Sequence, residues 1–319
     1  MNKHLGNELQ IRGVEEMRLV GGRADGMRIL NVRNGLGLEF TVSADRCADI
    51  SRLSFKGDNF GYFSACGYVS PKYYDDRGAG FLKSFTAGFF TTCGLTAVGS
   101  PCCDASEELP LHGTISNTPC QSIGWYTEDN AIHIRAAVRD AAPFAHKLLL
   151  EREYVCPFDE NAVYLNDTVK NIGSDTAPFQ ILYHCNMGYP LLSESARVSI
   201  PSESVMPRNE HAGTGLDRCL EIEPPQAGFE EMCYYHKFSG KPTVSVENAE
   251  IGRKLSLSFD TAELKSFTEW KMMGAYDYVL GLEPGNCLPD GRDAARRDGS
   301  LEFLKPGEER KIHIKFMCE

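Results

Sequence analysis

The chain lacks the features of secreted, membrane-spanning and nucleic-acid-binding proteins. Residues 1–10 are polar and contain no apolar stretch of about 7–15 residues, which a secretory signal requires. No run approaches the roughly 18 apolar residues of a membrane-spanning helix. The 33 basic side chains are outnumbered by 44 acidic ones, and the formal net charge is -11. Because nucleic acids and anionic membranes attract basic surfaces, we expect neither a nucleic acid nor a membrane as a partner.

The chain also lacks the cysteine spacing of a metal site. None of its 12 cysteines is separated from another by two residues, and the adjacent Cys102 and Cys103 cannot easily face one tetrahedral ion together. We therefore expect no metal site. Secreted disulfide frameworks are usually short and dense in cysteine, whereas these thiols are spread along a long chain. This distribution favours reduced thiols in a cytoplasmic protein.

Common catalytic and nucleotide-binding motifs are missing. There is no GxxxxGK(S/T) sequence, and Gly35-Leu36-Gly37 has no third glycine where a dinucleotide-binding fingerprint requires one. Neither a GxSxG nor an HExxH sequence occurs. We therefore expect a protein that works without a cofactor. These absences do not exclude a phosphorylated substrate, because one local pair of Arg or Lys side chains would suffice to bind it.

Short stretches with alternating apolar and polar residues are abundant. The hydrophobic share of 42% is ordinary for a folded protein. Alternation of this kind is typical of strands, and turn residues such as Asn34-Gly35 separate the stretches. The predicted strands cover residues 28–32, 38–42, 133–138, 147–155, 163–169, 179–183, 243–246, 255–259 and 312–316. Helix signals are few, so the pattern predicts an all-β sandwich or barrel.

No linker, fixed-period repeat or low-complexity tract interrupts the chain. We therefore expect residues 1–319 to form a single domain, as large all-β proteins often do. The longest irregular segments are residues 68–80, 98–109 and 286–300. Loops of this length in a compact β protein often carry function, so we expect them to form the rim of a substrate site.

Three segments place polar residues among unusually apolar or glycine-rich neighbours. They centre on His112, His184 and Glu283, and the last two stand at the ends of apolar stretches. Loss of water there would raise the pKa of a carboxyl group and lower that of an imidazole, toward values useful for proton transfer near neutral pH. Taken separately, the residue types favour a plainer interpretation, in which the histidines belong to the core and the glutamate lies on a solvated turn.

Taken together, three motifs change this interpretation. In chain order the motifs are Leu111-His112-Gly113 (followed by Trp125), Tyr183-His184-Cys185-Asn186 and Leu282-Glu283-Pro284-Gly285-Asn286. They resemble, respectively, the sugar-binding, catalytic-histidine and catalytic-glutamate motifs of the galactose mutarotase (aldose 1-epimerase) superfamily. Residues 182–192, and the first motif with Ser116-Asn117, are similar, more narrowly, to its uncharacterised DUF4432 branch. The resemblance begins near residue 28, which leaves residues 1–27 as an N-terminal extension or edge strands. It implies a large, many-stranded antiparallel β-sandwich.

The resemblance also implies catalysis by a general acid and a general base. Glu283 would be the base and His184 the acid, while His112 would hydrogen-bond a ring or anomeric oxygen of the sugar. Asn186, in the same motif as His184, is included among the substrate-binding residues. No metal takes part in this chemistry.

The sequence departs from the family pattern at several positions. Thr114 follows the Leu-His-Gly motif where the family has a second glycine. The family's aspartate that binds sugar hydroxyls has no clear counterpart, and Asp260 is the candidate for it. The arginine that precedes Leu-His-Gly in many members would be replaced by Lys83 or by Arg46, and the sequence does not choose between them.

The implied function is the interconversion of sugar anomers by acid/base ring opening. Two alternatives stay open: a sugar-binding module without turnover, and a lyase or isomerase that acts on a modified sugar on the same scaffold. A glycosidase fits less well, because no second carboxylate can be paired with Glu283 from the sequence. The expected partner is a small-molecule carbohydrate, and the chain could form a homodimer.

Overall fold

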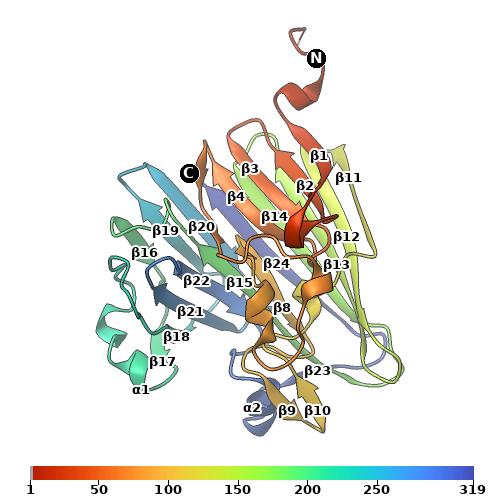
Figure 1. Ribbon diagram of the computed structural model, residues 1–319, viewed down its shortest axis with the longest axis vertical. Coiled ribbons are helices and arrows are strands. Elements are labelled where there is room, and N and C mark those ends of the chain that lie inside the picture. The colour runs from red at the N-terminus through yellow and green to blue at the C-terminus, as the bar shows by residue number, and fades with distance from the viewer. Residues whose placement is uncertain (1–2) are drawn as a thin grey trace.

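The computed structural model describes residues 3–319, and two large antiparallel sheets form most of the molecule (Figure 1). The larger has eight strands. In spatial order they are β11 (Ser122–Glu128), β12 (Ala131–Ala141), β13 (Lys147–Pro157), β14 (Ala162–Asn171), β24 (Glu309–Cys318), β20 (Arg253–Phe259), β19 (Thr243–Asn248) and β16 (Ala196–Ser199).

The second large sheet has seven strands and carries the polar residues of interest. Its main path is β17 (Ser204–Pro207), β18 (Met232–Lys237), β21 (Ser266–Met273), β22 (Tyr278–Gly285), β15 (Ala177–Met187) and β23 (Glu302–Leu304), and β8 (Phe90–Leu95) also pairs with β15.

A five-stranded sheet is formed by the N-terminal part of the chain. It consists of β1 (Gly13–Arg18), β2 (Arg28–Arg33), β3 (Leu38–Ser43), β4 (Asp49–Phe55) and β5 (Asp58–Asn59). Residues 13–18 therefore form an edge strand. Two small ribbons pair β6 (Tyr62–Phe63) with β7 (Ala87–Gly88) and β9 (Cys102–Asp104) with β10 (Glu107–Leu109).

Helices are short. The α-helices are α1 (Glu210–Gly213) and α2 (Arg292–Arg297). The 3-10 turns are η1 (Glu8–Gln10), η2 (Gly22–Ala24), η3 (Pro71–Tyr73), η4 (Gly80–Ser84), η5 (Ile115–Asn117) and η6 (Leu216–Arg218). Within residues 3–319, no helix has the length and apolar character needed to cross a membrane.

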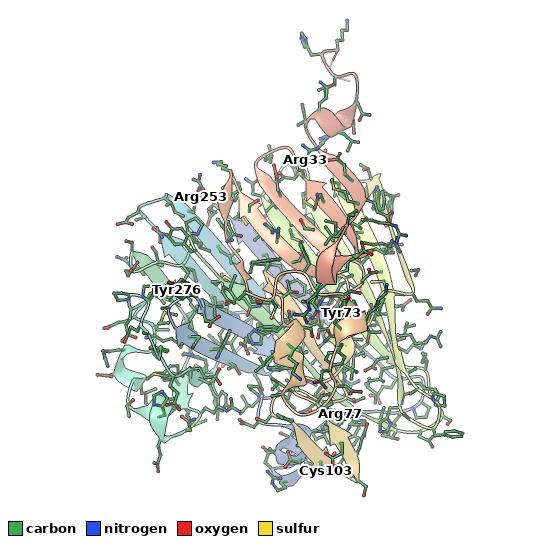
Figure 2. All side chains as sticks on the ribbon, viewed as in Figure 1. Arg33, Tyr73, Arg77, Cys103, Arg253 and Tyr276 are labelled. Carbon is green, nitrogen blue, oxygen red and sulfur yellow. The ribbon has the colours of Figure 1, made fainter. Side chains whose placement is uncertain are left out.

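The predicted all-β, many-stranded antiparallel sandwich is confirmed. Every strand expected from alternation lies inside an observed strand. One hydrophobic cluster extends from Val14 to Cys318 and joins all three larger sheets. All twelve cysteines, which lie within residues 3–319, are unpaired, and only Cys103 among them is exposed. Figure 2 labels Cys103 near the β9–β10 ribbon.

Strand β15 lies at the centre of this arrangement and positions one of the histidines. All eleven of its residues are buried, because β22 and β8 flank it and both of its faces are covered. Tyr183 and His184 point to opposite faces, as neighbours in a strand do. On the inner face, the Tyr183 hydroxyl donates to Asp167 Oδ2 at 2.7 Å.

A buried ion network fixes the inner face of β15. The Arg152 guanidinium, fully buried, donates to Asp167 Oδ2 and to Asp49 Oδ1, each at 2.7 Å. Charged groups held this far from water need such paired hydrogen bonds. Through Asp167 and Tyr183 the network links β4, β13, β14 and β15, and so anchors the strand one residue before His184.

Candidate active site

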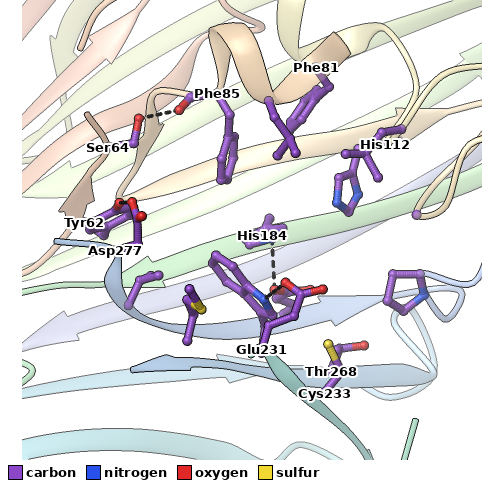
Figure 3. Close-up of a pocket in the computed structure, with 18 of the residues that line it drawn as sticks. Tyr62, Ser64, Phe81, Phe85, His112, His184, Glu231, Cys233, Thr268 and Asp277 are labelled. Carbon is purple, nitrogen blue, oxygen red and sulfur yellow. Dashed lines mark hydrogen bonds and ion pairs between the residues drawn. The ribbon is translucent and has the colours of Figure 1, made fainter. Parts of the chain in front are cut away.

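One cavity of about 620 Å³ is lined by His112, His184 and Glu283. Figure 3 shows the two histidines on its wall. His184 comes from β15, Glu283 from β22 and His112 from the segment between β10 and η5. Two of the three long irregular segments contribute to its wall, through Gly99 and Ser100 and through Pro289. None of the lining residues comes from the third segment, residues 68–80.

His184 and Glu283 face each other across neighbouring strands. The register between β15 and β22 pairs Cys185 with Leu282, which places His184 opposite Glu283. His184 Nε2 lies 3.2 Å from Glu283 Oε1, and the side chains are only 7% and 2% exposed. Groups so close can pass a proton through one bound hydroxyl.

A glycine makes room for this carboxyl group. A Cβ on Gly281 would lie 2.4 Å from Glu283 Oε1 and 2.9 Å from Trp270 Cβ. Gly281 is the register partner of Trp270 and stands two residues before Glu283 on the same face of β22. Any side chain at residue 281 would therefore displace the Glu283 carboxyl group or the Trp270 ring.

His112 enters the cavity from a constrained turn. Its φ is 60°, in the left-handed region that few residues other than glycine adopt. Its backbone N–H donates to Gly99 O at 2.9 Å, and its ring centre lies 5.5 Å from that of His184.

The residues after His112 differ in their need for glycine. A Cβ on Gly113 would lie 2.3 Å from Gly94 O, so glycine is required there. Thr114 has an ordinary φ of -113°, which explains why a second glycine is not needed.

Loss of water shifts the pKa values of all three groups. Burial raises the pKa of Glu283 well above its ordinary value, with a further increase from the nearby Glu231 carboxylate and a decrease from Arg208. Burial lowers the pKa of His184 to about 4. Burial, reinforced by the charge that His184 would carry, lowers the pKa of His112 to about 3. These directions favour a protonated Glu283 and a neutral His184 over the ionised pair.

Several buried polar atoms on the cavity wall have no hydrogen-bond partner. Among the described residues they are His112 Nδ1, His184 Nδ1, Thr268 Oγ1 and Glu283 Oε1. Glu283 Oε1 is near enough to His184 for an ion pair but is not aligned for a hydrogen bond. Because buried polar atoms are nearly always paired, this concentration indicates that the cavity binds a polar ligand.

Four other residues expected from the sequence do not line the cavity. Lys83 is exposed, and its Nζ contacts Asp75 at 2.6 Å. Arg46 is buried and donates to Val69 O at 3.1 Å. Asp260 occupies a turn, where its Oδ2 lies 3.4 Å from Lys241 Nζ.

Asn186 is the fourth of these residues, and it is completely buried. Its Nδ2 donates to the backbone oxygen of His184 at 2.8 Å, so it braces the strand beneath the histidine. None of Lys83, Arg46, Asp260 and Asn186 is among the residues that line the cavity.

Other polar residues line the cavity without having been expected. Trp270 Nε1 donates to Glu231 Oε2 at 2.6 Å, which places a carboxylate beside an aromatic ring. Arg208 donates to Asp290 Oδ1 at 3.1 Å and to Ser100 Oγ at 3.0 Å, and so joins three segments at one end of the cavity.

At the other end of the cavity, the Tyr62 hydroxyl donates to Asp277 Oδ1 at 2.9 Å (Figure 3). Aromatic rings beside hydrogen-bonding groups suit a sugar, which has both apolar faces and hydroxyl edges. Within residues 3–319, no group of three or more His, Cys, Asp or Glu side chains is arranged to hold a metal ion.

Solved structures show the class of protein to which this fold belongs. A Klebsiella pneumoniae protein described as a candidate aldose 1-epimerase aligns with a TM-score of 0.91 and 26% identity, over 98% of this chain and 86% of that one. A galactose mutarotase-like protein from Clostridium acetobutylicum aligns with a TM-score of 0.70 and 12% identity, over 97% and 99% of the two chains. A galactose 1-epimerase from Lactobacillus acidophilus aligns with a TM-score of 0.64 and 12% identity, over 97% of this chain and 99% of that one. The protein has a galactose mutarotase-like fold.

The family follows from the sequence. Residues 24–318 match the family described as domain of unknown function DUF4432, and the chain belongs to it. The membership predicted from the three motifs is thus confirmed, and the match begins close to the predicted residue 28. No protein with a curated description matches the chain.

Proposed function

We propose that this protein interconverts the α and β anomers of an aldose by opening and closing the sugar ring. The observation that carries the proposal is the contact between His184 Nε2 and Glu283 Oε1, 3.2 Å apart in the wall of a 620 Å³ cavity. The similarity to structures described as aldose 1-epimerases supports it. Because fold alone does not determine activity, the proposal depends on this pair.

The proposed reaction needs one base and one acid. The Glu283 carboxylate takes the proton from the anomeric hydroxyl, and protonated His184 gives a proton to the ring oxygen as the bond between that oxygen and the anomeric carbon breaks. The open-chain aldehyde rotates about its C1–C2 bond and closes with the two roles reversed. The ionised pair holds the same single proton as the neutral pair, and the two side chains lie 3.2 Å apart.

Exchange spectroscopy by NMR tests the proposal. The purified protein is added to equilibrated aldoses, sugar acids and sugar phosphates, and exchange between the α and β signals is measured against buffer alone. We expect catalysed exchange with no change in the anomer ratio. A new product would instead indicate a lyase or isomerase, and binding without exchange would indicate a sugar-binding module.

The pKa directions predict how exchange depends on pH. A second proton on the His184–Glu283 pair removes the base, and loss of the first removes the acid. Because burial lowers the pKa of His184 to about 4, the second proton binds only at acidic pH near that value. Because burial raises the pKa of Glu283 well above its ordinary value, the pair keeps its first proton as the pH rises past the normal carboxyl range.

We therefore expect kcat/KM to be level through pH 6.5, about where an exposed imidazole titrates. The measurement is the NMR exchange rate across the pH range, corrected for spontaneous exchange at each pH. A fall in kcat/KM centred near pH 6.5 would contradict this prediction, because it would show that the pair gains or loses its catalytic proton where an exposed imidazole titrates.

A further inference from the structure

Thr268 stands in line with the two proposed catalytic residues. The register between β21 and β22 places Thr268 opposite Glu283, and that between β22 and β15 places Glu283 opposite His184. All three side chains line the cavity, so they form a row across three neighbouring strands of one sheet face. The next residue in this row, on β18, is Tyr235, whose hydroxyl already donates to Asp290 at 2.6 Å.

Within residues 3–319, the Thr268 hydroxyl has no hydrogen-bond partner. The residue is 1% exposed, and its Oγ1 is among the buried atoms without a hydrogen bond. Valine has nearly the same shape and suits a strand equally well, so a fold alone gives no reason to bury an unpaired hydroxyl here. An unpaired, buried hydroxyl on the wall of a cavity indicates a hydrogen bond with a ligand.

The order of the row matches the order of atoms in a sugar ring. In an aldose ring, the anomeric carbon lies between the ring oxygen and carbon 2. Neighbouring strands are about 4.8 Å apart, so residues in such a row contact successive positions along one small ligand. A sugar that turns its ring oxygen to His184 and its anomeric hydroxyl to Glu283 therefore turns carbon 2 toward Thr268.

We propose that Thr268 binds the hydroxyl group on carbon 2 of the substrate, and that the protein selects aldoses in which this hydroxyl is free. The inference rests on the proposed function, because the acid–base pair fixes the direction of the sugar ring. It makes Thr268 a specificity-determining residue. A site that hydrogen-bonds a hydroxyl discriminates against the analogue that lacks it, since its own polar group is then left unpaired.

The test compares each sugar with its 2-deoxy form in wild-type protein and in Thr268→Val. The probes are D-galactose with 2-deoxy-D-galactose and D-glucose with 2-deoxy-D-glucose, and the readout is kcat/KM for anomer exchange. We expect wild-type protein to prefer the parent sugar by about tenfold, the size of one hydrogen bond. Thr268→Val should lose this preference by slowing the parent sugar alone, and Thr268→Ser should keep most of it.

Two controls separate this role from a structural one. Thr268→Val should melt at the wild-type temperature or above, because the substitution removes a buried hydroxyl that has no partner. Ser43 also has a buried hydroxyl without a partner in the described part of the chain, but it does not line the cavity, so Ser43→Ala should leave the sugar preference unchanged.

The outcomes distinguish this inference from the proposed function. Equal discrimination by wild-type protein and Thr268→Val overturns the role of Thr268, even if exchange is fast. If no sugar exchanges, the proposed function fails, and dissociation constants for the same sugar pairs then test Thr268 alone. A parent-sugar preference in binding that Thr268→Val abolishes would support its role, whereas equal affinities, or no binding by any of the sugars, would overturn it.

Discussion

Replacing Glu283 with glutamine should slow catalysed anomer exchange by at least about 100-fold, while sugar binding persists. Glutamine keeps the shape of the side chain and its place above Gly281, but its amide cannot take the proton from the anomeric hydroxyl. The buried carboxyl group lies 3.2 Å from His184 Nε2, so the substitution removes one member of the proton-transferring pair. The measurement is the NMR exchange rate at saturating sugar, together with a dissociation constant.

The chain offers a matched control for this substitution. Glu269 is also fully buried and also pairs with a histidine, with its Oε2 3.0 Å from His236 Nε2. It does not line the cavity, because its side chain projects from the opposite face of β21 to that of Trp270. Glu269→Gln should leave the exchange rate within about threefold of wild type. Equal losses in the two variants would indicate a general effect of disturbing buried carboxyl groups, and would contradict the assignment of Glu283 as the base.

The strands and the central pair could be predicted because their signals are local. Alternation shows in each strand separately, and a histidine or glutamate within an apolar stretch is conspicuous wherever it occurs. His184 and Glu283 stand out in this way. The motif order then links them, since the sequence contains no direct sign that residues 99 positions apart lie on neighbouring strands.

The rest of the cavity wall could not be predicted, because its signals are either hidden or distant. In β21 the face turned away from the cavity carries Glu269 and Lys271, and both are buried. Charged residues on a buried face break the usual alternation of apolar and polar residues, so Thr268 and Trp270 on the other face do not stand out in the sequence. Arg208 reaches the cavity only because the chain folds its segment against Asp290, 82 residues away. Neither propensity nor spacing reports such a contact, and the sequence therefore offered Lys83 or Arg46 as the basic residue of the site and did not point to Arg208.

The two histidines should respond differently to asparagine. Asparagine can donate a hydrogen bond but cannot transfer a proton. His184→Asn should therefore lower kcat by at least about 100-fold, because His184 supplies the proton to the ring oxygen. His112→Asn should keep kcat within about threefold of wild type and raise KM by about tenfold, because the amide replaces only part of a sugar contact. Polarimetry over a range of sugar concentrations gives both constants.

Folding should survive both substitutions, and this separates a catalytic cavity from an ordinary core. His112 Nδ1 and His184 Nδ1 have no hydrogen-bond partner among residues 3–319, so replacing either ring breaks no hydrogen bond at that atom. Circular dichroism should show wild-type spectra and cooperative melting for both variants. Unfolding of both would show that these histidines serve the core, as their residue types alone suggested. Reversed kinetic effects, with kcat lost in His112→Asn and KM raised in His184→Asn, would instead assign proton transfer to His112.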